Sequence, residues 1–156
     1  MKLNITKQFQ DYLKSIGIDI RSLLIQAGIP DKSWKEELTL NSLDYHRLLL
    51  CLDQALTEEN ILALSQISNI QLFVPSFFAA LSAKNGLEVI ERFAKFKKLL
   101  GPIDLDIIYN EQTVSIHFSY THKQLELPKF SVLNEQLLIL DLLRTGSKLP
   151  IKPLIL

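Results

Sequence analysis

The side chains best able to do chemistry in this sequence are three histidines and a pair of aspartates. His46, His117 and His122 have no cysteine, histidine or acidic partner at the spacing that a metal site needs. Asp104 and Asp106 fall on one face of a predicted strand, which allows a carboxylate pair for acid–base work but is more typical of a solvated face. We therefore expect no catalytic constellation, no metal site and no cofactor.

The single cysteine and the missing signature motifs lead to the same expectation. Cys51 lies inside an apolar run, residues 48–52, where a buried small hydrophobe is more common than a reactive thiol. The sequence contains no GxGxxG, no GxxxxGK followed by Ser or Thr, no GxSxG and no HExxH. We expect a protein that binds a molecule rather than an enzyme.

Aromatic residues and two cations mark the candidate ligand site. The densest aromatic cluster is residues 72–78, and Arg92 and Lys97 would anchor a small anionic or polar-ended metabolite. The expected site, between the helical layer and the inner face of a hairpin, consists of Phe73, Phe77, Phe78, Arg92, Phe96, Lys97, Phe118 and Tyr120. Two alternatives stay open: the phenylalanines fill the core, and Arg92 pairs with Glu88 on the same helix.

Helical signals fill the first hundred residues. Gly17 separates two short helical patterns, 9–16 and 20–27, and Asn41 is a predicted N-cap for a long helix in which His46 lies off the apolar stripe and is expected to be exposed. Thr57 caps a further helix, and an apolar stripe with late lysines predicts another over residues 87–100. These signals predict an N-terminal layer of four or five helices.

Alternation replaces the helical period after residues 101–102. Residues 103–109 and 113–121 are predicted to form a hairpin. Its apolar face would hold Val114, Ile116, Phe118 and Tyr120. A helix from Ser131 to Arg144 follows and is expected to bury Leu133, Leu137, Leu140 and Leu143, before a last strand in the apolar run 149–156. The expected fold class is α+β, with the helical layer followed by a ββαβ antiparallel sheet unit.

Composition limits the kind of protein. The 156 residues suit one domain, and 17 basic residues balance 17 acidic residues, which excludes a polybasic nucleic-acid arm. No apolar run approaches the roughly 18 to 20 residues that span a bilayer, so no membrane partner is expected. One cysteine and a polar start at residues 1–10 favour the cytoplasm.

Four stretches of the chain resemble the amino-terminal sensing domain of AraC-family transcription regulators, of the type called arabinose-binding-like. They are residues 12–30 with "LLIQAGIP", residues 38–48, residues 86–100 with "GLEVIERF", and the alternating strands of 103–121 with the helix after Pro128. The resemblance implies a small-molecule effector and a homodimer, with DNA bound only through a helix-turn-helix half that is missing here. Residues 1–156 would then be one regulatory domain, shortened at its C-terminal end.

Two questions stay open at this level. A protein-interaction or dimerisation module without a ligand is the alternative function. Self-association is expected because the last helix has more apolar positions than one stripe needs, with Leu138, Ile139 and Leu142 beside Leu137 and Leu140. The rival explanation is that a missing C-terminal stretch covers this surface.

Overall fold

The computed structural model describes residues 2–74 and 76–155, which form an α+β fold, as expected. The chain opens with strand β1 (Lys2–Thr6), which pairs antiparallel with β2 (Glu37–Asn41). Leu3 lies opposite Leu40 and Ile5 opposite Leu38, so the apolar side chains share one face of this small sheet. The β1 strand was not predicted, although its residues alternate between polar and apolar.

Helices α1 (Lys7–Ser15) and α2 (Ile20–Gln26) form the predicted short pair between the two strands. Thr6 caps α1 by accepting a hydrogen bond from the Phe9 N–H, and Asp19 caps α2 in the same way through the Arg21 N–H. Gly17 follows α1 with φ of 88°, a left-handed conformation that glycine adopts without a steric cost. The glycine that separates the two helical patterns in the sequence therefore ends α1 through its left-handed backbone conformation.

Helix α3 (Ser42–Ala55) begins at the predicted cap, because the Asn41 side chain accepts a hydrogen bond from the Asp44 N–H. Helix α4 (Glu58–Ser65) begins with a capping box in which Thr57 and Asn60 satisfy each other's backbone N–H groups. The short α5 (Ile67–Ile70) follows at once. The expectation that His46 is exposed was wrong, because its side chain is buried and its Nε2 lies 2.9 Å from the Glu126 carbonyl oxygen.

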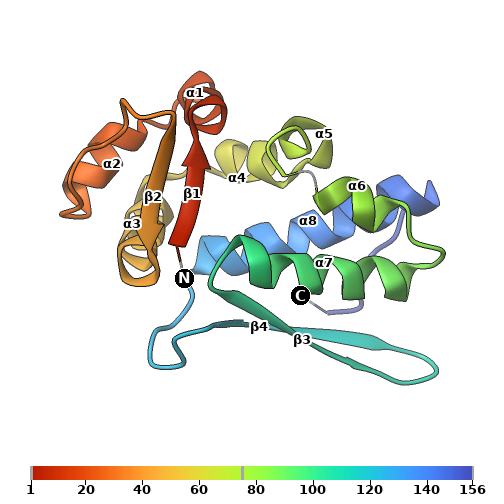
Figure 1. Cartoon of the computed structure of the whole chain (residues 1–156). Coiled ribbons are helices and arrows are strands. Elements are labelled where there is room, and N and C mark those ends of the chain that lie inside the picture. The colour runs from red at the N-terminus through yellow and green to blue at the C-terminus, as the bar shows by residue number, and fades with distance from the viewer. Residues whose placement is uncertain (1, 75, 156) are drawn as a thin grey trace.

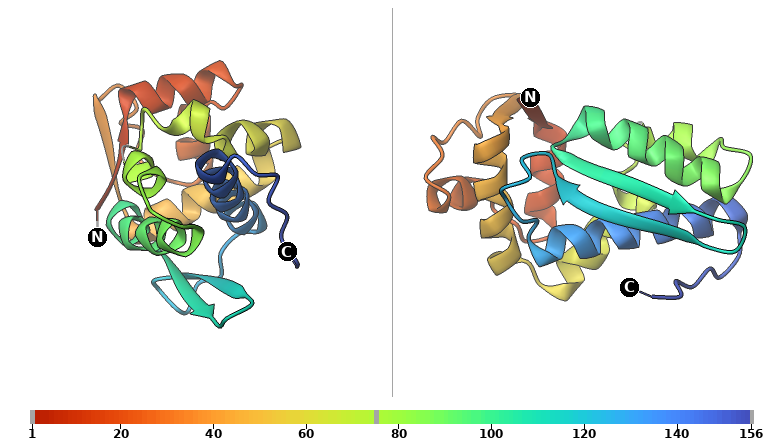
Figure 2. Two further views of the ribbon diagram at one scale, coloured as in Figure 1. Left: turned by 90° about the vertical axis from the view of Figure 1, so that its right-hand side faces the viewer. Right: turned by 90° about the horizontal axis from the view of Figure 1, so that it is seen from below.

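Helices α6 (Ser76–Leu81) and α7 (Gly86–Leu100) pack against each other and lead into the hairpin. Strands β3 (Ile103–Tyr109) and β4 (Val114–Tyr120) pair antiparallel, with Leu105 opposite Phe118. The predicted division of faces holds next to the core, where Leu105 and Tyr120 are buried while His117 and Ser119 are exposed. It fails at the far end, where Val114, expected on the apolar face, is 42% exposed. The hairpin lies below α7 and α8 in Figure 1. In the right view of Figure 2, which looks from below, the hairpin lies in front of these helices.

Helix α8 (Lys129–Ser147) runs through the centre of the helical layer and packs against α3, α4, α5, α6 and α7. The expected buried face was wrong. Leu138, Ile139 and Leu142 are buried, whereas Leu133 is 39% exposed and Leu137, Leu140 and Leu143 are half-buried. Because five helices surround it, the side chains that suggested self-association are covered within the chain.

The last expected strand does not form. Residues 149–155 contain no strand, and Leu156 lies outside the described residues. Pro150 and Pro153 lack the N–H group that a strand ladder requires. The segment is held instead by Arg144, whose Nε donates a hydrogen bond of 2.8 Å to the Ile151 carbonyl oxygen. The helical layer is thus followed by β3, β4 and α8 alone.

Two groups of buried apolar side chains make up the core. One group gathers residues of α5 to α8 and the hairpin, including Phe77, Phe93 and Leu142. The other lies between the β1–β2 sheet and helices α1, α2 and α3, and includes Leu24 and Leu38. Helix α3 contributes to both groups, so it joins the N-terminal elements to the rest of the fold.

Candidate binding cavity

A cavity of about 250 Å³ lies where the two core groups meet. Residues of β1, α1, α3, α5, α7 and α8 contribute to its walls. The β1 strand supplies the stretch 3–6, so segments from both ends of the chain meet around the same space. The volume of the cavity is slightly below the range that small-molecule sites typically show.

Most of the wall is apolar. Phe73 packs against Phe9 and Tyr12, with ring centroids 5.3 and 5.4 Å apart, at one side of the cavity. Phe77 stacks on Phe93 at 5.9 Å, and a set of aliphatic side chains closes the rest. That set includes Leu48, Leu49, Leu52, Leu64, Ile70, Val74 and Leu138. These contacts fix the aromatic rings and leave little room for them to turn into the space.

One ion pair lies in this mostly apolar wall. Lys97 Nζ on α7 lies 2.6 Å from Glu135 Oε1 on α8, and the two side chains are 18% and 4% exposed. Lys97 also lies 5.9 Å from the centroid of the Phe93 ring. A carboxylate buried this deeply would be costly without its ammonium partner. The pair therefore fixes the position of both charges at the cavity wall.

Two polar atoms beside this pair have no partner among the described residues. They are Glu135 Oε2 and the hydroxyl oxygen of Ser131, and both residues are 3% exposed. Ser131 precedes Glu135 by four positions on α8, so the two side chains lie on the same face of the helix, and both line the cavity. Buried polar atoms are nearly always hydrogen-bonded, so these two atoms need a donor or acceptor that the described residues do not supply.

Tyr45 completes the polar end of the cavity. Burial, with a smaller contribution from the negative charge of Glu135, raises the pKa of Tyr45 to about 12. Its phenol thus stays protonated throughout the physiological range. Asn134 lies nearby, with its Oδ1 3.0 Å from the Ser65 hydroxyl oxygen.

Three of the eight residues expected at the ligand site line this cavity. They are Phe73, Phe77 and Lys97. Phe96 is half-buried on α7 and does not line it, and Phe118 packs on the core side of the hairpin. The cavity therefore lies closer to β1 and α3 than the expected position between the helices and the hairpin.

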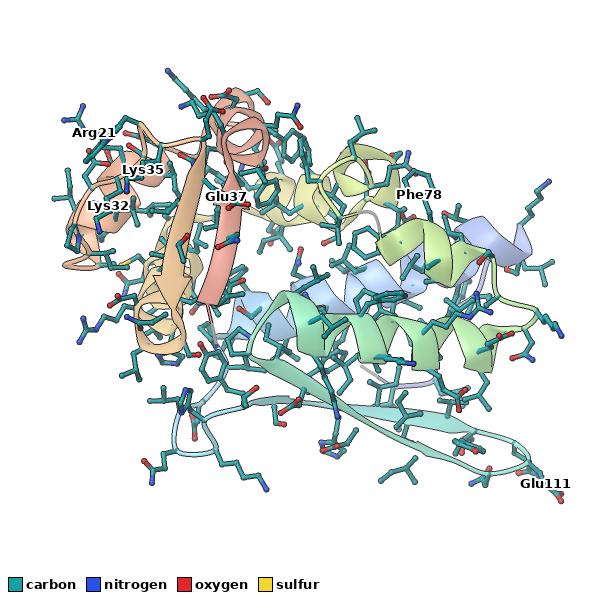
Figure 3. The ribbon with its side chains drawn as sticks, in the orientation of Figure 1. Arg21, Lys32, Lys35, Glu37, Phe78 and Glu111 are labelled. Atoms are coloured by element: carbon teal, nitrogen blue, oxygen red, sulfur yellow. The ribbon has the colours of Figure 1, made fainter. Side chains whose placement is uncertain are left out.

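The remaining three residues have other partners. Arg92 donates hydrogen bonds to the Ala79 carbonyl oxygen at 2.8 Å and to Glu88 Oε1 at 2.7 Å, which is the alternative interpretation of that residue. Phe78 is 53% exposed, and Figure 3 shows it at the outer side of α6. The buried Tyr120 hydroxyl donates to the Ser42 carbonyl oxygen at 2.6 Å, and burial raises its pKa.

The polar half of the cavity, namely Tyr45, Ser131, Asn134 and Glu135, was not predicted from the sequence. The signal was present in α8, where a serine and a glutamate recur at helical spacing beside the leucines that form the core face. Polar residues in that register are often solvent-facing, and only the position of Lys97 on α7 shows that this pair is internal.

Other kinds of site find no support in the described residues. They contain no group of three or more His, Cys, Asp and Glu side chains placed to hold a metal ion. Across residues 2–74 and 76–155, no helix has both the length and the apolar character needed to cross a membrane. Comparison with protein-family models, with curated proteins and with solved structures gives no match to this chain.

Proposed function

We propose that this chain is a small-molecule-sensing regulatory domain, of the kind found in the amino-terminal half of AraC-family transcription regulators. The observation that carries the proposal is the cavity of about 250 Å³, with mostly apolar walls and one buried ion pair beside two polar atoms that have no partner among the described residues. Binding sites for small molecules combine these features, because apolar walls supply affinity and a few fixed polar groups supply orientation.

The composition of the cavity favours binding over turnover. Its two charged side chains, Glu135 and Lys97, form an ion pair with each other. The hydroxyl of Ser131 has no general base within hydrogen-bond distance among the described residues. A nucleophile without a base is not activated. We therefore propose a receptor rather than an enzyme.

The position of the cavity suits a regulatory role. Its wall includes β1 and α1 from the N-terminal core group, α7 and α8 from the other, and α3, which belongs to both. A ligand at this boundary would stabilise the arrangement of the two groups that fits it best. Binding would thereby bias the packing of the N-terminal elements on the helical layer. A partner that contacts either of these two parts would then bind with a different affinity.

A thermal-shift screen of metabolites, followed by titration calorimetry, tests the binding role. The decisive variant is Ser131→Leu, which fills the polar end of the cavity and should abolish binding of any hit. Thr145→Leu, at an exposed position of the same helix, is the matched control and should leave binding unchanged. A hit that binds both variants equally well would show that it occupies another site.

A second candidate function is an interaction module, and the end of the hairpin favours it. Ile108, Tyr109 and Val114 are 66%, 58% and 42% exposed, on a hairpin whose outer edges are not paired with another strand among the described residues. Glu111, at the turn, lies far from the helical layer in Figure 3. Open edges and exposed apolar residues are typical of surfaces that pair with another chain.

Light scattering separates this second function from the first. If the hairpin end joins two copies in a homodimer, Ile108→Lys should yield a monomer, whereas Glu111→Lys at the exposed turn should leave the dimer intact. A chain that is monomeric without substitution, at concentrations well above those in the cell, would exclude this mode of self-association.

A further inference from the structure

We infer that the cavity selects an uncharged ligand with an apolar body and one hydroxyl group, which bridges Glu135 Oε2 and a second N–H of the Lys97 ammonium. The inference rests on the proposed binding function and names the chemical class of the ligand. Of the two alternatives expected from the sequence, an anionic or a polar-ended metabolite, it keeps the polar-ended one; the anionic one was based on Arg92 and Lys97. Arg92 is bonded to α6 and to Glu88, and the charge of Lys97 is balanced at 2.6 Å by Glu135.

The charge balance excludes an ionised head group. Lys97 and Glu135 are the only charged side chains among the described residues that line the cavity. An anion would approach a carboxylate, and a cation would approach an ammonium group that already shares its carboxylate. Either ion would also lose its hydration on entering an apolar space without gaining an unshared countercharge. A neutral head group avoids both costs.

The hydrogen-bonding groups match a hydroxyl. Glu135 Oε2 lacks a donor, and the ammonium of Lys97 has three N–H groups, of which the ion pair with Oε1 uses one. A hydroxyl donates one hydrogen bond and accepts others, so one such group satisfies Glu135 and Lys97 together. Ser131, one helical turn away on α8, supplies a further hydroxyl that both donates and accepts.

The walls restrict the rest of the ligand. Phe73, Phe77, Ile70 and Val74 offer no polar side-chain atoms, and the described polar lining gathers around Glu135 and along β1. A sugar or other polyol would bury several hydroxyls against these apolar walls without partners, at a cost for each one. The ligand therefore has one polar end, and its body is apolar and compact enough for about 250 Å³.

Four probes that share a benzyl body test the inference on the full chain: toluene, benzyl alcohol, benzoate and benzylammonium. Dissociation constants come from amide chemical-shift titrations, in which Phe73 and Phe77 report on the cavity. We expect benzyl alcohol to bind about tenfold tighter than toluene, since one hydrogen bond to a charged group contributes that much. Benzoate and benzylammonium should bind more weakly than either.

Charge-changing variants sharpen the result. Glu135→Gln leaves Lys97 unbalanced and should shift the preference toward benzoate, whereas Lys97→Met leaves Glu135 unbalanced and should shift it toward benzylammonium. Thr145→Leu, at the exposed position of α8, keeps both charges and should preserve the order of the four probes. Should the charge variants fail to fold, the order measured on the unmodified chain still decides the inference.

The outcomes separate this inference from the function on which it rests. A preference of the unmodified chain for benzoate or benzylammonium would overturn the hydroxyl assignment and leave the binding function in place. Equal binding of toluene and benzyl alcohol would likewise overturn the assignment, because the polar end would then contribute nothing. Absence of binding by all four probes, with the cavity holding only water, would overturn the proposed function as well.

Discussion

The Asp53 carboxylate of α3 accepts a hydrogen bond of 2.8 Å from the backbone N–H of Phe130, and so caps α8 from a neighbouring helix. Pro128, at the N-cap position of α8, has no side chain able to accept such a bond. The cap of α8 is therefore supplied by Asp53, which is distant in sequence but adjacent in the fold. It also fixes the start of the helix that carries Ser131 and Glu135.

Removal of this cap should destabilise the whole chain. We expect Asp53→Ala to lower the free energy of unfolding by about 1 to 2 kcal/mol, the usual cost of a lost N-cap. Gln54→Ala, at the next position of α3 and also exposed, is the control and should change stability by less than about 0.5 kcal/mol. Urea denaturation followed by circular dichroism measures both. Equal effects of the two substitutions would show that the Asp53 bond contributes nothing.

The adjacent residues Phe77 and Phe78 should differ sharply in their effect on stability. Phe77 is 4% exposed and stacks on Phe93, whereas Phe78 is 53% exposed. Phe77→Ala opens a cavity in the core and should cost about 3 to 5 kcal/mol, and Phe78→Ala should cost less than about 1 kcal/mol. Thermal and urea unfolding of the two variants measure the difference. A large loss with Phe78→Ala would contradict the placement of α6.

Ser131 and Ser65 form a matched pair of buried serines. The Ser65 hydroxyl donates to the Ile61 carbonyl oxygen at 2.6 Å and lies 3.0 Å from Asn134 Oδ1, while the Ser131 hydroxyl has no partner among the described residues. Ser131→Ala should therefore raise the free energy of unfolding by up to about 1 kcal/mol, since an unsatisfied hydroxyl is removed and alanine favours the helix.

Ser65→Ala should have the opposite effect and lower stability by about 1 kcal/mol, because it removes the hydrogen bond to the Ile61 carbonyl oxygen and the polar contact with Asn134 Oδ1. Urea denaturation of the two variants gives the comparison. If Ser131→Ala destabilises as much as Ser65→Ala, then an ordered water already satisfies the Ser131 hydroxyl in the free protein.

The helices were predictable where their signals are local. Asn41 and Thr57 cap the helices that follow them through side-chain contacts three residues away, and such contacts can be read from sequence. The β1 strand was missed because it is five residues long and its partner, β2, lies beyond two helices. Its pairing is a long-range contact, which no local pattern indicates.

The candidate cavity was only partly predictable for the same reason. Phe73, Phe77 and Lys97 belong to apolar or basic clusters that stand out in the sequence, and they do line the cavity. Glu135 and Ser131 become internal only because α8 passes between five helices, which places Lys97 of α7 against it. Which face of α8 is buried depends on the tertiary packing around it. Helical periodicity alone therefore predicted a face of α8 that is less buried than the observed one.

DNA binding provides a separate test of the charge balance. The chain has 17 basic and 17 acidic residues, and Arg21 Nε on α2 lies 3.0 Å from Asp31 Oδ2. Phosphate contacts need unpaired cations, so we expect no sequence-selective binding by residues 1–156 alone. Fluorescence polarisation with labelled duplexes at low and high salt measures it. Selective, salt-sensitive binding would disprove the expectation.

Alkaline pH should weaken the fold through Tyr45. Its pKa is raised from 10.0 to about 12 in the folded chain, chiefly by burial and also by the charge of Glu135. Between these two values the unfolded chain has released the phenol proton and the folded chain still holds it, so the free energy of unfolding falls as pH rises. The stabilising contribution is complete below pH 10 and is lost on passing through about 12.

Tyr45→Phe removes this ionisation and should flatten the loss of stability over that interval. The slope should not vanish, because burial also raises the pKa values of Tyr12 and Tyr120 in the folded chain. Urea denaturation at a series of pH values above 9 measures the slope, and tyrosinate absorbance of the folded chain measures the ionisation directly. Identical slopes for the variant and the unmodified chain would mean that Tyr45 ionises at its ordinary pKa and is not buried against Glu135.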